Sequence, residues 1–159
     1  MHYLRCENLF VLVATHGKHE FFEEESRNIR DVREVPIKFA GYSLTCRRGD
    51  FKQKREGQKQ AKRDDKYRVR VQVSREVYLD WRAYFVDRAR FCSAERLAQE
   101  LYVFPYEPYA PVRKQMLTIL RLANKVRKQR GLGKLEPSVL RYRRRIVKPF
   151  EVAEGQSEL

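Results

Sequence analysis

Hydrophobic positions in the first half of the chain follow the patterns of strands. Residues 9–14 form a continuous apolar run of about a strand's length, which predicts a buried strand. From residue 67 to residue 73 the alternation is strict: one face carries Val69, Val71 and Val73, and the other carries Arg68, Arg70 and Gln72. Residues 37–46 also have extended character, so we expect residues 42–46 to pair with residues 67–73 as a hairpin.

Helical periodicity replaces this alternation in the second half. Ser74 is a plausible N-cap for a helix reaching about Arg90, and Ser93 can cap a second helix that turns Leu97 and Leu101 inward. A third helix is expected from about Val112 to Gln129. Its apolar stripe comprises Met116, Ile119, Leu120, Ala123 and Val126. The charged residues 21–33 are compatible with one further short helix.

These elements predict an α+β fold, in which a small antiparallel β-sheet or hairpin is followed by a helical region with basic extensions. We expect three segments. Residues 1–73 form a β-rich unit with a basic loop at 47–66, residues 74–148 form the helical region, and residues 149–159 form an acidic tail. A loop of about 20 residues is unusual in a compact domain and is often functional or disordered.

The charge of the chain indicates that this small fold binds a polyanion. Its 159 residues include 35 Lys and Arg against 21 Asp and Glu, a formal net charge of +14. Residues 47–75 hold 12 basic and 4 acidic side chains, and residues 113–148 hold 13 basic and 1 acidic. An ordinary solvated surface mixes both signs. Two concentrated blocks favour contacts with nucleic-acid phosphates, and nearby Tyr and Phe rings favour RNA over duplex DNA.

The candidate RNA-binding residues are the cations of these two blocks. In the first block they are Arg47, Arg48, Lys52, Lys54, Arg55, Lys59, Lys62, Arg63, Arg68 and Arg70. In the second they are Arg121, Lys125, Lys128, Arg141, Arg143, Arg144 and Arg145. We expect the loop cations to thread into RNA, Arg68 and Arg70 to contact phosphates, and the arginines near residue 143 to anchor the second surface.

Catalytic motifs are absent from the sequence. It contains no phosphate-binding or dinucleotide-binding glycine motif and no nucleophile elbow. His16 and His19 have neither the paired cysteines nor the H-E-x-x-H frame of a zinc site, and three widely spaced cysteines indicate a reducing compartment. We therefore expect no enzyme activity, no cofactor and no metal. No apolar run reaches the length of a membrane-spanning helix.

The first predicted strand also carries a resemblance. Residues 5–13, Arg-Cys-Glu-Asn-Leu-Phe-Val-Leu-Val, align without a gap with the R-Y-A-D-D-F-V-hydrophobic-hydrophobic stretch of group II intron reverse transcriptase/maturases. Residues 39–44 resemble the family's F-L-G-Y segment, and residues 47–49 with 68–74 are similar to its next hairpin. The helices that follow resemble its thumb or maturase region. The resemblance covers about residues 3–90.

The catalytic positions of that family are the ones that differ. Asn8 and Leu9 stand where the family has its two metal-binding aspartates, and Cys6 stands at the tyrosine. An amide and an alkyl group cannot hold a pair of Mg²⁺ ions. The resemblance therefore implies a degenerate palm and thumb remnant that has kept RNA-facing surfaces and lost polymerase activity.

Together these observations predict a non-catalytic RNA-binding protein of a large ribonucleoprotein, first of all a mitochondrial ribosomal protein that binds rRNA. The alternative is a maturase-like splicing factor that binds intron RNA. The first residues resemble neither a secretory signal nor an organellar presequence, so we expect a mitochondrial, organelle-encoded protein, or alternatively a bacterial cytoplasmic one. Expected partners are RNA and neighbouring proteins of the particle, with no membrane.

Overall fold

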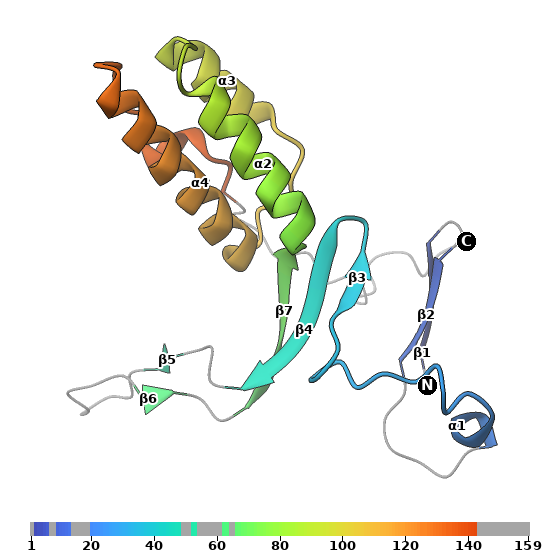
Figure 1. The fold of residues 1–159 in the computed structure, drawn as a ribbon. Helices are drawn as coiled ribbons and strands as arrows, with labels where there is room; N and C mark the ends of the chain where they lie inside the picture. The colour runs from blue at the N-terminus through green and yellow to red at the C-terminus, as the bar shows by residue number, and fades with distance from the viewer. Residues whose placement is uncertain are drawn as a thin grey trace, which may run out of the picture.

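The structure is a computed structural model, and it describes residues 2–6, 9–13, 20–48, 52–53, 62–63 and 66–142. It has the expected α+β fold, with short antiparallel strands followed by helices (Figure 1). The strands are β1 (His2–Cys6), β2 (Leu9–Val13), β3 (Ile37–Phe39), β4 (Tyr42–Arg48), β5 (Lys52–Gln53), β6 (Lys62–Arg63) and β7 (Tyr67–Val73). The helices are α1 (Glu20–Glu24), α2 (Arg75–Arg88), α3 (Ala94–Val103), α4 (Ala110–Gln129) and the 3-10 turn η1 (Pro137–Val139).

The central sheet has the order β3-β4-β7 and is antiparallel throughout. The predicted hairpin is confirmed, because β4 pairs with β7 over its whole length, from Tyr42 opposite Val73 to Arg48 opposite Tyr67. Ala40 and Gly41 both have positive φ and make a two-residue turn between β3 and β4. Within the expected basic loop, β5 and β6 form a short antiparallel pair.

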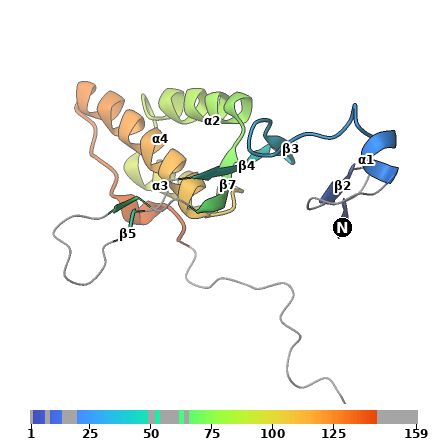
Figure 2. The same ribbon diagram turned by 90° about the horizontal axis from the view of Figure 1, so that it is seen from below.

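The first strand prediction is confirmed in its position but not in its burial. β2 pairs with β1, a strand the sequence pattern had not indicated, and Val11 and Leu12 are only half-buried. Figures 1 and 2 both show β1, β2 and α1 apart from the helices α2, α3 and α4. The predicted helix at 21–33 is shorter than expected: α1 has five residues, and hydrogen-bonded turns follow it.

The hydrophobic core lies among α2, α3, α4 and the end of β7. Its fully buried side chains are Phe85, Leu97, Leu101, Val112, Met116 and Ile119, each of which contributes about 1.5 to 3 kcal/mol by burial. The Trp81 and Phe104 rings pack edge to face at 4.9 Å. Tyr84 is exposed, and its ring contacts the buried Phe85 edge to face at 5.1 Å.

Two side-chain amides join the parts of this helical region. Gln115 accepts a hydrogen bond from the Val73 N–H (2.9 Å) and donates one to the Val73 carbonyl (3.1 Å), which fastens α4 to the end of β7. Asn124 makes the same double contact with the backbone of Leu135, so the segment after α4 folds back onto the helix. The chain changes from strand to helix at the predicted boundary after residue 73, but Val73 itself lies in the helical core. The division into 1–73, 74–148 and 149–159 remains a prediction.

Candidate nucleic-acid interface

The register of β4 and β7 gathers three of the predicted cations on one face of the sheet. Arg47 lies directly opposite Arg68, and Thr45 lies directly opposite Arg70. Because directly opposed residues share a face and alternate residues along a strand repeat it, Arg47, Arg68 and Arg70 lie on the same side. We call this group the strand face. It is opposite the side whose Tyr42 and Val73 meet the helical core.

The strand face is unfavourable for an isolated sheet. Side chains directly opposite each other have Cβ atoms about 4.5 to 5.5 Å apart, and like charges in that position are destabilising. Arg47 and Arg68 are such a pair, and both are exposed. A polyanion placed over this face would relieve the repulsion between their guanidinium groups.

Arg48 lies on the other side of the sheet from these residues. Its guanidinium stands 4.3 Å from the ring centroid of Tyr67, and the guanidinium of Arg33 stands 5.7 Å from the same centroid. Both distances fall within the range of cation–π attraction. Hydrogen bonds from Arg33 to the Asp31 carboxylate raise the pKa of Arg33, so it stays cationic. Sequence reasoning missed Arg33, because it lies in a segment of mixed charge.

The cations of α4 form a second group. Arg121, Lys125 and Lys128 are exposed and follow one another at spacings of four and three residues, which places them on one face of the helix. Lys114 is exposed on the same face, seven residues before Arg121; its spacing could have revealed it in the sequence. We call these four residues the helix stripe. Like charges at such spacings weaken an isolated helix.

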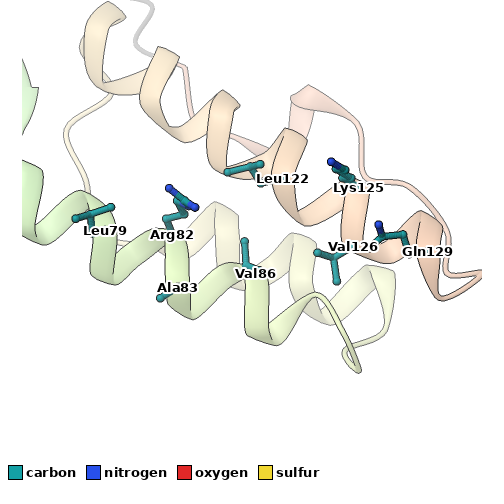
Figure 3. A pocket seen from close by; sticks show the side chains of 8 residues that line it. All are labelled: Leu79, Arg82, Ala83, Val86, Leu122, Lys125, Val126 and Gln129. Carbon is teal, nitrogen blue, oxygen red and sulfur yellow. The ribbon is translucent and has the colours of Figure 1, made fainter.

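A shallow groove runs between α2 and α4 beside the helix stripe (Figure 3). It encloses about 550 Å³ and is lined by Leu79, Arg82, Ala83, Val86, Leu122, Lys125, Val126 and Gln129. Figure 3 shows Val86 and Val126 directed between the two helices, with the cationic side chains of Arg82 and Lys125 above them. Arg82, which the charge blocks did not include, therefore adds a cation to the groove that Lys125 also lines.

Arg141 is tied to its own chain more closely than expected for a residue predicted to anchor RNA. Its Nη2 donates hydrogen bonds to the backbone carbonyls of Phe104 (2.6 Å) and Tyr106, and its guanidinium stacks over the Tyr106 ring at 4.8 Å. These bonds hold the segment after η1 against the linker between α3 and α4. The Nε of Arg141 takes part in none of them.

The remaining predicted cations cannot be placed as side chains. For Lys52, Lys62 and Arg63 the structure describes the backbone only, which puts Lys52 opposite Arg63 in the β5–β6 pair. The others lie outside the described residues: Lys54, Arg55, Lys59, Arg143, Arg144 and Arg145. Their roles stay predictions.

Within the described part of the chain, no group of three or more His, Cys, Asp or Glu side chains is placed to hold a metal ion. His16 and His19 lie outside that part. Cys46 and Cys92 are free thiols, half-buried and buried respectively. None of the described helices is both long and apolar enough to cross a membrane.

Comparisons of the chain with protein-family models, with curated proteins and with solved structures find no match. The resemblance to group II intron reverse transcriptase/maturases therefore rests on the residues quoted above and stays a prediction.

Proposed function

We propose that this protein is a non-catalytic RNA-binding protein that holds RNA on the strand face and the helix stripe, as a structural component of a large ribonucleoprotein. The observation that carries the proposal is the register of β4 and β7, which sets Arg47 against Arg68 and brings Arg70 to the same face. Like charges gathered on one face repel each other, and a polyanion bound there lowers that repulsion. Phosphates of RNA supply that charge.

Exposed rings beside arginines favour RNA with unpaired nucleotides over duplex DNA. The guanidinium groups of Arg33 and Arg48 both lie close to the Tyr67 ring, and Arg113 stands over the Tyr142 ring at 5.4 Å. Bases that are not stacked in a duplex bind to aromatic side chains and to guanidinium planes. In a rigid duplex the phosphates are accessible but the bases stay stacked. A duplex would therefore contact the cations but not these rings.

The test compares two charge-reversed variants of the full chain that change the net charge equally. One carries Arg47→Glu, Arg68→Glu and Arg70→Glu, and the other carries Arg121→Glu, Lys125→Glu and Lys128→Glu. Affinity for a fluorescent single-stranded RNA is measured by polarisation at several salt concentrations. Each phosphate contact contributes about 0.7 to the slope of log affinity against log salt concentration, so each variant should lower the slope by about 2.

A matched control reverses three exposed arginines outside both groups: Arg27, Arg75 and Arg96. The control changes the net charge by the same amount, so it separates the position of the charges from their number. Equal salt slopes in all three variants would contradict the proposal. Tighter binding to duplex DNA of equal length than to the RNA would contradict the preference for unpaired nucleotides.

The kind of ribonucleoprotein is a separate question that sedimentation addresses. We propose a ribosome, that of a mitochondrion, as the particle; the protein should then remain with ribosomal subunits through a high-salt gradient. A maturase-like role in splicing predicts instead that the protein co-purifies with a single intron-containing transcript. Metal-dependent nucleotide incorporation or RNA cleavage by the purified protein would contradict both roles.

A further inference from the structure

The linker between α3 and α4 and the segment after η1 meet at a cluster of two arginines and two tyrosines. Arg141 stacks on Tyr106 at 4.8 Å, and Arg113 stands over the ring of Tyr142 at 5.4 Å. Tyr106 is buried, whereas Tyr142 is 70% exposed. The cluster therefore reaches from the core to the surface.

Three buried polar atoms of this cluster have no hydrogen-bond partner among the described residues: the Tyr106 hydroxyl, the Arg113 Nε and the Arg141 Nε. A buried donor left without a partner is destabilising, and a folded chain rarely holds several in one place. Burial raises the pKa of Tyr106, and the positive charge of Arg141, whose guanidinium lies 4.8 Å from the ring, opposes that rise. Arg141 already donates to two backbone carbonyls through Nη2, so each arginine keeps one unused Nε donor, and a charged donor of this kind binds an anionic acceptor most strongly.

A hollow of about 740 Å³ opens beside the cluster, within the size range of small-molecule sites. We call it the linker pocket. Its lining residues are Tyr102, Glu107, Pro108, Ser138, Leu140, Arg141 and Tyr142. Tyr102 is 56% exposed, so two accessible tyrosine rings border the same hollow.

The charges around the linker pocket are not uniform. Arg141 supplies positive charge in the lining and Glu107 supplies a carboxylate, while Arg113 lies behind the lining, against the ring of Tyr142. A free phosphate would make no use of the rings. A ligand with a phosphate and a flat aromatic group uses both the guanidinium groups and the rings, and a nucleotide has that composition.

We propose that the linker pocket binds one unpaired nucleotide of an RNA strand, with its phosphate on Arg113 and Arg141 and its base stacked on Tyr142 or Tyr102. The inference rests on the proposed RNA-binding function and adds to it a site that recognises a base as well as a phosphate. It also gives the exposed tyrosines at this end of the molecule a function that the two cationic groups do not provide.

The experiment measures binding of the full chain to two five-unit oligomers, a fluorescent uridine oligonucleotide and its abasic ribose-phosphate counterpart. Tyr142→Ala removes the ring, and Tyr142→Phe keeps it as a matched control. Stacking on one aromatic side chain changes affinity by roughly 5- to 150-fold. We expect Tyr142→Ala to weaken uridine binding by an amount in that range, Tyr142→Phe to change it less than about 2-fold, and neither to affect the abasic oligomer.

Two further measurements make the result decisive. Arg113→Gln should weaken binding of both oligomers, because both carry the phosphate. Ultraviolet crosslinking of the unaltered chain to the uridine oligonucleotide should attach it to a peptide containing Tyr142 or Tyr102. This second readout needs no variant and holds even if a substitution perturbs folding.

The failures of the two proposals are distinguishable. If Tyr142→Ala and the unaltered chain bind the uridine oligonucleotide equally while reversal of the strand face still weakens binding, the linker pocket is wrong and the proposed function stands. A crosslink found only outside the linker pocket would overturn the site in the same way. If the unaltered chain binds neither oligomer at any salt concentration, both proposals fail.

Discussion

Replacement of Arg127 by methionine is expected to destabilise the helical region strongly. Arg127 belongs to α4, but its side chain is only 1% exposed. Its Nε donates to the Gly133 carbonyl at 2.6 Å, and its Nη1 donates to the Cys92 carbonyl at 2.8 Å. One side chain therefore connects α4 with the turn between α2 and α3 and with the segment that follows α4.

The size of the effect follows from these two bonds. A hydrogen bond from a charged donor contributes about 1.5 to 3 kcal/mol, and a buried acceptor left without a partner adds a penalty. The Cys92 contact is buried, so water cannot replace the guanidinium there, whereas Gly133 is exposed and its carbonyl can be hydrated. Methionine fills much of the same space and removes a buried charge, which offsets part of the loss. We expect a net loss of about 2 to 4 kcal/mol.

Urea unfolding followed by the fluorescence of Trp81, the single tryptophan, measures this loss inside the helical region. With a slope of about 2 kcal/mol per molar urea, the midpoint should fall by about 1 to 2 M. Arg127→Lys keeps the charge but loses the planar fork that reaches the two carbonyls through separate nitrogen atoms, and it should lose about half as much. Lys128→Met, at the exposed neighbouring position, is the control. A midpoint for Arg127→Met within about 0.3 M of the unaltered chain, at equal slope, would refute the reasoning.

Three further predictions concern single contacts. A hydrogen bond from Arg88 holds the pKa of Glu100 below its usual value. The stability that this ion pair provides is present at neutral pH and is lost as the pH falls through the lowered pKa. In Glu100→Gln, the free energy of unfolding should therefore decrease less steeply as the pH is lowered. Gln115→Ala removes both bonds to Val73 and should cost about 1 to 3 kcal/mol in urea unfolding, with Lys114→Ala as its exposed control. Ala40 has a φ of +45°, which asparagine tolerates better, so Ala40→Asn should raise the thermal midpoint; an unchanged or lower midpoint would contradict this account of the turn.

Much of the fold could be predicted because its elements obey local rules. The strict alternation from residue 67 gave the correct strand, and its partner followed from the next extended segment. Ser93 accepts a hydrogen bond from the Arg96 N–H, as expected of an N-cap, whereas Ser74 precedes its helix without such a side-chain bond. β1 was missed because its short run of mixed residues has no clear period of two, and it is defined by pairing with β2.

The candidate site was predictable in its composition but not in its arrangement. Counting the charges in a segment treats Arg47 and Arg48 alike, although neighbouring residues of a strand point to opposite sides of the sheet. It also could not show that Arg141 binds backbone carbonyls. Arg127 differs from the exposed cations of α4, because its side chain is buried. It lies four residues after Ala123 and seven after Leu120, which places it on the apolar face of the helix. This position indicated burial, but arginine is usually exposed, so the sequence alone did not predict it.

Ion pairs connect several elements of the described structure, whereas the strand face and the helix stripe gather like charges. Arg88 pairs with Glu100 between α2 and α3, Arg90 pairs with Asp87 at the end of α2, and Lys38 pairs with Glu76 between β3 and α2. The same chain sets Arg47 against Arg68 and spaces Arg121, Lys125 and Lys128 along one helix face. The proposed function accounts for these two like-charged groups, because the phosphates of RNA carry the opposite charge.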